Sequence, residues 1–272
     1  MSDQDAVPDE EFDPSFTGTL HEKEWIGRLL ADFHEENWLT DVLFRVKGGK
    51  EATVYCCKAH PATGLEYIAA KVFRPRIFRA MRNDWLYRQG RVNLDQEGKT
   101  LLGGRTLRAL KKKTAFGQEI QSSSWCQHEF ATLRLLHEAG ADVPRPLAAS
   151  SHAILMEYVG DGTRGAPVLQ RVALEQGEAQ ALFERLMWNV ELMLSLHRVH
   201  ADLSAYNVLY WEGRASIIDL PQAVDPQRNP AALALLTRDI ERLCQYFARQ
   251  GVTTHAGILT ADLWRKYLRG EL

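Results

Sequence analysis

The sequence predicts an α+β protein of two lobes, with a small antiparallel sheet in the first lobe and a reduced set of helices in the second. Strand-like runs separated by turn residues fill residues 42–73, whereas helical periodicity dominates after residue 178. At 272 residues the chain also exceeds the usual domain size of about 100–150 residues. We expect a disordered acidic tail at residues 1–16, an N-terminal helix together with the first lobe at residues 17–158, and a helical second lobe at residues 159–272.

The composition is that of an ordinary globular protein, with 45% hydrophobic and 25% charged residues. Cys56, Cys57, Cys126 and Cys244 lack the C-x-x-C spacing of a zinc site or a disulfide framework, so they are expected as small buried hydrophobes in a reducing compartment. The start of the chain is acidic, unlike a signal peptide, and no apolar run approaches the length of a membrane span. We therefore expect a cytoplasmic protein with no membrane partner.

The first lobe should begin with a helix at residues 21–37, where apolar side chains recur at helical spacing. Three short strands follow and are joined by tight turns, so they must form an antiparallel meander. The strands are expected at residues 42–46, 52–57 and 67–73.

A basic segment interrupts this pattern after the third strand. Residues 74–113 hold 12 Lys and Arg against 3 Asp and Glu, which leaves 21 against 32 in the rest of the chain. The formal net charge of −2 therefore hides a strong asymmetry. The whole insertion is expected to extend from residue 74 to residue 121. Two interpretations of it stay open: either it is a solvated, partly mobile loop, or it contacts phosphate, RNA or an acidic partner.

Order is expected to resume with a helix at residues 125–138. The serines at 122–124 offer N-cap side chains, and Gly140 provides a stop signal. The prolines at 144 and 146 then favour an extended turn. An apolar strand is expected at residues 152–158.

The second lobe should be mainly helical. Pro167 suits the start of a short helix through residue 174, and a long amphipathic helix is expected at residues 178–197. A two-strand hairpin should follow, with strands at residues 208–211 and 215–218. Two helices should complete the lobe, one at residues 230–249 with Asn229 as its N-cap and one at residues 261–268 with Thr260 as its N-cap.

The most informative motif is HADLSAYN at residues 200–207, between the long helix and the hairpin. Phosphoryl transfer of the kinase type needs a carboxylate near the attacking hydroxyl, and an Asn and a second Asp to hold Mg²⁺ on the phosphates. Asp202, Asn207 and Asp219 provide this set in order, and the hairpin should bring Asp219 back beside Asn207. The pattern H-x-D-x₄-N is loose by itself, but with the strand and Asp downstream it predicts an ATP-dependent phosphotransferase of protein-kinase-like architecture.

Lys71 at the third strand supports the same interpretation. A lysine there could extend to solvent from an edge strand, but kinases place one at this point to reach the α- and β-phosphates and to pair with a helix glutamate. The following helix offers Glu129 and Glu138. Glu129, one turn into the helix, is the preferred partner.

The turn before Lys71 is a weaker signal. Gly49, Lys50 and Glu51 lie between the first two strands, and glycine lets backbone N–H groups approach phosphate oxygens. The turn lacks the spacing of G-x-G-x-x-G and of a P-loop, so an ordinary hairpin turn also fits. Its position ahead of Lys71 favours a contact with phosphate.

Together these motifs resemble the RIO family of atypical kinases over about residues 40–250. The family's catalytic loop H-x-D-L-S-x-Y-N matches residues 200–207 throughout. Its G-K-E-A turn and I-I-D-x-x-Q strand match residues 49–52 and 217–222. A hinge-like segment at 155–160 and the helix around Glu129 are also similar to family elements.

The resemblance implies a kinase fold with ATP between the lobes and adenine on the hinge backbone, at Met156, Glu157 and Val159. It implies Asp202 as the catalytic base, Asn207 and Asp219 as ligands of Mg²⁺ or Mn²⁺, and Lys50 and Ser204 near phosphates. Family members act as Ser/Thr kinases or as ATPases that form an aspartyl-phosphate at the position of Asp219.

Two departures from the family pattern narrow this expectation. The Ser-Thr pair that precedes G-K-E-A in the family is Lys47-Gly48 here, so a hydroxyl contact with phosphate is lost or replaced by charge. The residues before the first strand are too few for the winged helix of one branch. The 53 residues after Asp219 also leave no room for the activation loop and peptide-binding helices of ordinary protein kinases.

Three functions stay open at this point. The chain transfers phosphate to protein Ser/Thr or to itself, or it phosphorylates a small molecule as aminoglycoside and choline kinases do. Alternatively, it is a nucleotide-switched assembly factor that contacts a ribosomal or other RNA–protein particle through residues 74–113. Asp239 is expected either to brace the catalytic loop or to be a plain surface carboxylate.

Overall fold

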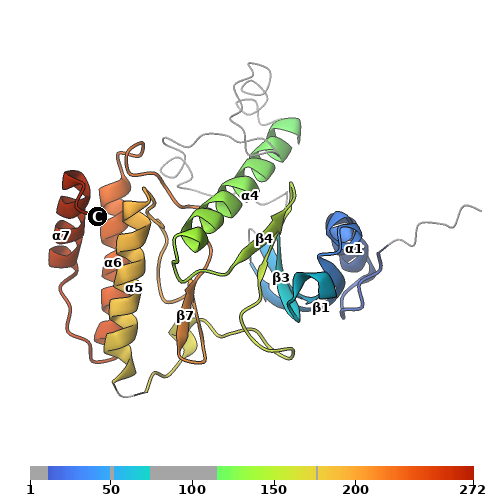
Figure 1. Ribbon diagram of the computed structural model, residues 1–272, viewed down its shortest axis with the longest axis horizontal. Helices are drawn as coiled ribbons and strands as arrows, with labels where there is room; N and C mark the ends of the chain where they lie inside the picture. The colour runs from blue at the N-terminus through green and yellow to red at the C-terminus, as the bar shows by residue number, and fades with distance from the viewer. Residues whose placement is uncertain (1–11, 50–51, 74–114, 176) are drawn as a thin grey trace, which may run out of the picture.

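A computed structural model describes residues 12–49, 52–73, 115–175 and 177–272. An antiparallel sheet forms one lobe and a group of helices the other, and a long helix, α4 (Ala115–Glu138), runs between them (Figure 1). The predicted two-lobed α+β fold is confirmed. The basic segment 74–113 and the residues Lys50 and Glu51 lie outside the described residues.

The sheet of the first lobe has the strand order β1-β2-β3-β5-β4, and every neighbouring pair is antiparallel. Its first three strands form the predicted meander. β1 is longer than predicted because its pairing with β2 continues past three register shifts, which interrupt the alternation of buried and exposed residues. The strands are β1 (Leu39–Gly48), β2 (Ala52–Ala59), β3 (Tyr67–Phe73), β4 (Pro146–Ala149) and β5 (Ala153–Glu157).

A helix closes one face of this sheet. In α1 (Leu20–Glu35), Ile26, Leu30 and Phe33 are buried in the same apolar cluster as strand residues of the sheet. Phe16 joins this cluster and packs edge-on against Tyr55, with ring centroids 5.4 Å apart. The expectation of disorder is therefore wrong for residues 12–16, because two phenylalanines in a polar stretch are enough to anchor it to the core.

Helix α4 starts ten residues before the predicted position, at Ala115 instead of 125. Ser123 and Ser124 are buried within the helix and do not cap it. Propensity favoured a cap at these serines, but tertiary packing overrides such a local preference. Further along, Cys126 packs with Phe73 of β3, whereas Leu133 lies in the core of the second lobe. Helix α4 therefore contacts both lobes.

The second lobe contains the predicted hairpin and three helices, packed around one large apolar core. The expected helix at 167–174 is wrong, because Val168 forms a β-bridge with Leu209 and only a 3-10 turn follows. The last helix begins five residues before the predicted start, so Thr260 is buried inside it. The elements are α5 (Glu178–Ser195), α6 (Ala232–Ala248), α7 (Ala256–Arg269), β6 (Val208–Trp211), β7 (Arg214–Ile217) and the 3-10 turns Pro61–Thr63 and Leu169–Arg171.

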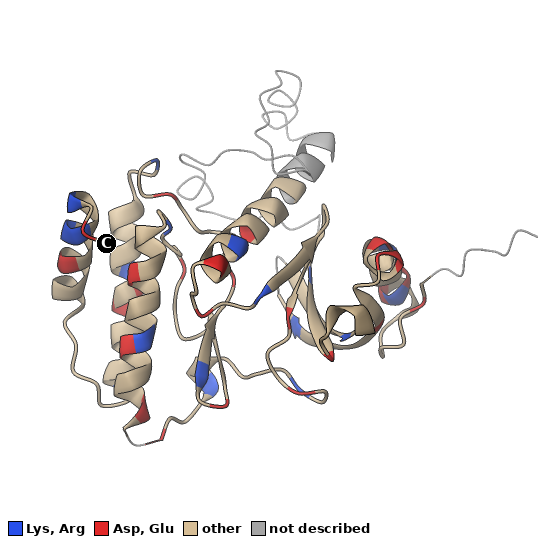
Figure 2. Cartoon of the chain, viewed as in Figure 1, with Lys and Arg blue, Asp and Glu red and all other residues tan. Residues whose placement is uncertain are grey.

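Charged residues of both signs are distributed along α5, α6 and α7 (Figure 2). The four cysteines are free and buried, as predicted. Over the ranges given above, no helix combines the length and apolar character that a membrane crossing requires.

Gly27 gives a test of the packing between α1 and the N-terminal segment. A Cβ at this position would lie 2.6 Å from the backbone oxygen of Phe12, which cannot move without displacing the segment. We expect Gly27→Ala to lower the free energy of unfolding by about 1–3 kcal/mol, although alanine is the better helix former. Gly257→Ala in α7 is the control, because no atom lies within 4 Å of its added Cβ, and it should stabilise by up to about 1 kcal/mol. Urea unfolding of both variants measures the difference, and equal stability would contradict the described contact.

Candidate active site

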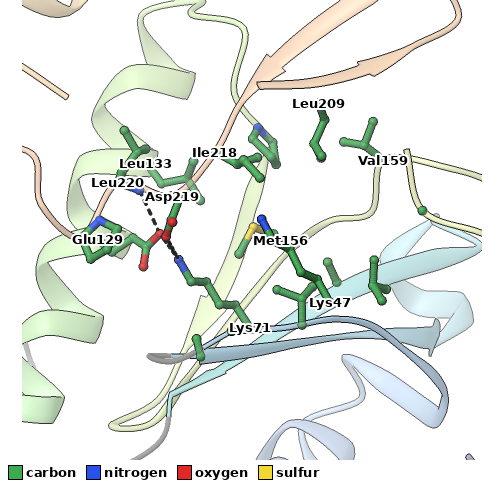
Figure 3. Close-up of a pocket in the computed structure, with 18 of the residues that line it drawn as sticks. Lys47, Lys71, Glu129, Leu133, Met156, Val159, Leu209, Ile218, Asp219 and Leu220 are labelled. Atoms are coloured by element: carbon green, nitrogen blue, oxygen red, sulfur yellow. Dashed lines mark hydrogen bonds and ion pairs between the residues drawn. The ribbon is translucent and has the colours of Figure 1, made fainter. Parts of the chain in front are cut away.

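A cavity of about 380 Å³ lies between the two lobes. Gly49, Lys71 and the hinge residues line it from the sheet side, and Glu129 lines it from α4 (Figure 3). The second lobe contributes Asp202 and Asp219, together with the apolar side chains of Leu209 and Ile218. Most of the residues expected to bind nucleotide therefore meet in one place.

Lys71 is the centre of this site. Its Nζ lies 2.6 Å from Oε1 of Glu129 and 2.8 Å from Oδ1 of Asp219, as the dashed lines of Figure 3 show. The backbone N–H of Leu220 donates to the same Oε1 of Glu129 at 3.1 Å. Glu138, the alternative partner, is exposed and pairs with Arg134 instead. The structure thus brings together one side chain from β3, one from α4 and one from the segment after β7.

The charges of this cluster influence one another's protonation. Burial alone would lower the pKa of Lys71, but the carboxylates of Asp219 and Glu129 outweigh it, so the pKa is raised above its ordinary value. The Lys71 ammonium in turn lowers the pKa of Asp219. Burial raises the pKa of Glu129, and Lys71 partly offsets this effect. Lys71 therefore stays charged at neutral pH.

The catalytic loop is held by helix α6. Ala201 has a left-handed backbone, with φ of 66°, which costs a non-glycine residue about 1–2 kcal/mol. The carboxylate of Asp239 compensates by accepting from the N–H groups of Ala201 at 2.7 Å and Leu203 at 3.0 Å, and Arg238 donates to the Ala201 carbonyl. Asp239 is buried, so it braces the loop and is not a surface carboxylate. Burial raises its pKa to about 7, although the two N–H groups oppose the shift.

Asp202 lies where two cavities meet. Its side chain lines the inter-lobe cavity and also a second cavity of about 450 Å³ in the helical lobe. Nη1 of Arg242 donates to its Oδ1 at 2.7 Å, and Nδ2 of Asn207 donates to its backbone oxygen at 2.9 Å. Its side chain remains 40% exposed, so the carboxylate is oriented but accessible.

The hairpin brings Asn207 and Asp219 close together, as predicted. Ile218 N–H donates to the carbonyl of Asn207 at 3.0 Å, and Val208 pairs with Ile217. A ring nitrogen of the buried His200 lies 3.1 Å from the Ile218 carbonyl, and burial lowers the pKa of this histidine. Asn207 and Ser204 line the second cavity and not the first.

The hinge is fixed by backbone hydrogen bonds on both sides. Glu157 N–H donates to the Arg145 carbonyl at 2.8 Å, and Ala166 N–H donates to the Val159 carbonyl at 2.8 Å. Met156, Glu157 and Val159 line the inter-lobe cavity. The segment therefore presents a rigid edge at the position expected for adenine.

Two further cations lie at the site. Lys47 lines the inter-lobe cavity, and its charge contributes to the lowered pKa of Asp219. The sequence signal for this charge is the replacement of the family's Ser-Thr pair by Lys47-Gly48. Arg242 follows Asp239 by three residues on α6, and no motif in the sequence pointed to it.

The comparisons with known proteins agree with this geometry. The family model described as "RIO domain" matches residues 86–258. The serine/threonine-protein kinase RIO1 of Chaetomium thermophilum is 29% identical over 83% of this chain and 43% of its own length. The RIO-type serine/threonine-protein kinase Rio1 of Thermoplasma acidophilum is 32% identical over 53% of this chain and 72% of its own length.

A solved structure supports the fold independently. The Rio2 kinase of Chaetomium thermophilum, solved as an ADP/Mg²⁺–phosphoaspartate complex, superposes with a TM-score of 0.64 at 21% identity. The superposition covers 88% of this chain and 66% of that one. The chain spans less than half the length of the RIO1 proteins of Chaetomium thermophilum and Schizosaccharomyces pombe. The family model covers well over half of the present sequence, and the chain belongs to the RIO domain family.

Proposed function

We propose that the protein transfers the γ-phosphoryl group of ATP to a Ser or Thr hydroxyl of a protein, itself included. The observation that carries the proposal is the convergence of Lys71, Asp202 and Asp219 on one cavity between the lobes. This is the arrangement that kinase-type transfer requires. The relatives named serine/threonine-protein kinase support it.

The cavity suits a nucleotide in shape and chemistry. Val54 and Ala69 from the sheet and Leu209 and Ile218 from the other lobe provide apolar surfaces for the two faces of adenine. The hinge at Glu157 and Val159 provides the polar edge. We place the triphosphate toward Lys71, whose ammonium Glu129 and Asp219 keep charged and oriented.

The donor set fits a magnesium ion held jointly with the phosphates. Nowhere in the described ranges do three or more His, Cys, Asp or Glu side chains gather as a metal cluster. Mg²⁺ in kinases needs only one or two carboxylates, with phosphates and water completing its shell. Asp219 offers a carboxylate, and the amide of Asn207, whose nitrogen donates to Asp202, offers its oxygen. When bound, the ion would neutralise negative charge on the phosphates.

The roles of the side chains follow from these positions. As the acceptor oxygen bonds to the γ-phosphorus, the bond to the bridging oxygen of ADP breaks, and the hydroxyl proton passes to the carboxylate of Asp202. The contact with Arg242 keeps that carboxylate oriented. Asp239 and Arg238 hold the loop that carries it.

The role of Asp202 is testable by an isosteric change. Asp202→Asn keeps the shape of the side chain but cannot accept the proton, so we expect phosphoryl transfer to fall by about 10²–10⁴-fold. The affinity for ATP should stay within a few-fold of wild type, because we assign the main contacts with adenine and triphosphate to the hinge and Lys71. Radiolabel transfer and calorimetric titration with ATP measure the two quantities. Wild-type transfer in this variant would disprove the assignment.

A second candidate is ATP hydrolysis through an aspartyl-phosphate on Asp219. The side chain of Asp219 is 45% exposed and lines the cavity, so one carboxylate oxygen is accessible to the γ-phosphorus. That oxygen would bond to phosphorus as ADP leaves, and water would then cleave the acyl phosphate. The related Rio2 kinase was solved with a phosphoaspartate.

Chemical stability distinguishes the two products. If the second candidate holds, ³²P on the wild-type chain is released by hydroxylamine, and Asp219→Asn incorporates none. Phosphoserine and phosphothreonine resist hydroxylamine. If all of the ³²P incorporated at every time point resists hydroxylamine, an aspartyl-phosphate is contradicted.

We further propose a cytoplasmic location and a contact with a ribosomal or other RNA–protein particle through residues 74–113. The support is the excess of Lys and Arg in this segment and the four free cysteines. Such a contact should weaken steeply with salt. Co-sedimentation with ribosomal particles at increasing salt tests it, and no co-sedimentation at low salt would contradict it.

A further inference from the structure

Asp202 lines both the nucleotide cavity and the second cavity. The second cavity measures about 450 Å³ and is lined by the catalytic loop, the turn at Gln170 and helix α6. Asp202 is the one acidic side chain among its lining residues, and it is already paired with Arg242. A hydroxyl group that enters this cavity would therefore meet the carboxylate proposed as the base.

The walls of this second cavity are held in place by hydrogen bonds. Gln170 N–H donates to the Ala205 carbonyl at 2.9 Å, which joins the turn to the catalytic loop. The hydroxyl of Tyr246 donates to the Leu169 carbonyl at 3.0 Å, which joins the turn to α6. The cavity is thus part of the folded lobe and not a gap between loosely packed loops.

Arg249 provides the remaining charge of the second cavity. Arg242, Gln245 and Tyr246 of α6 and the C-cap residue Arg249 follow one another at helical spacing, so they share one face. Arg242 is neutralised by Asp202, whereas Arg249 is exposed and, within the part of the chain that is described, forms no ion pair. The cavity therefore keeps one net positive charge, at the end that lies away from Asp202 along the helix.

From this arrangement we propose that the second cavity binds the phosphate acceptor, and that Arg249 selects a Ser/Thr peptide with an acidic side chain near the acceptor residue. A guanidinium binds a carboxylate in a bidentate manner and is well suited to this role. The inference rests on the proposed kinase function and adds its substrate class.

The helix sets the spacing within such a peptide. Arg242 contacts Asp202, and Arg249 at the C-cap of α6 lies seven residues further along the chain, which corresponds to about 10 Å at the helical rise. An extended peptide covers this distance in about three residues. The acidic side chain should accordingly lie about three positions from the acceptor Ser or Thr.

Peptides of matched length test the proposal. One series carries Glu three positions before or after a single Ser, and the others carry Gln or Lys there. We expect kcat/KM of the wild-type protein to be about 5- to 10-fold higher for one of the Glu peptides than for its Gln counterpart. Arg249→Glu should abolish this preference and favour the Lys peptide instead. Arg269→Glu makes the same change of charge on α7, outside this cavity, and should keep the wild-type preference.

The possible outcomes distinguish the proposed acceptor site from the proposed transferase function. Peptide phosphorylation with no preference for Glu, or a preference that Arg249→Glu leaves intact, overturns this inference alone. Binding of ATP without transfer to any peptide or to the chain itself overturns the proposed transferase function as well. Phosphoryl transfer to small hydroxyl compounds but to none of the peptides would also contradict a peptide site.

Discussion

The site depends on one buried cation. Lys71 is almost removed from solvent, and a buried ammonium is stable only where carboxylates surround it. Its two partners come from α4 and from the segment after β7, so the pairing ties the sheet, the intervening helix and the second lobe to one point. Because Glu129 also accepts from Leu220 N–H, the same carboxylate fixes the backbone that follows Asp219. The cavity between the lobes exists because these three segments are held at this distance.

Helix α6 has the corresponding role for the catalytic loop. Asp239 compensates the left-handed backbone of Ala201, and Arg242 orients the carboxylate of Asp202. An ordinary protein kinase has room for further elements between its metal-binding aspartate and such a helix, whereas the present chain passes from β7 to α6 in a short segment. One helix therefore supports the loop directly, and its face also lines the second cavity.

Much of this site could be predicted because its residues follow fixed spacings. Lys71, Asp202, Asn207 and Asp219 belong to motifs whose order and spacing are characteristic of kinases. The position of Glu129 on the helix favours it over Glu138 as the partner of Lys71, and the structure places Glu129 at Lys71. The kinase roles of these residues stay predictions.

Other features have no local signal in the sequence. Serines are good N-caps, so the sequence predicts that α4 starts directly after them, yet packing buries Ser123 and Ser124 within the helix. β4 begins at Pro146 and consists of only four residues, too few to show a periodic pattern. Arg242 approaches Asp202 across 40 residues of sequence, so only the folded chain reveals their contact.

The attachment of Asp202 to α6 has a consequence for any motion of the lobes. The aspartate, the helix face with Arg249 and the turn at Gln170 all belong to the same lobe and are joined by hydrogen bonds. If the sheet lobe were to move relative to the helical lobe, this assembly would travel as a unit. Under the proposed roles, the alignment of an acceptor hydroxyl with Asp202 would then be independent of how far the cleft is open, and only the phosphate donor would have to be brought into line.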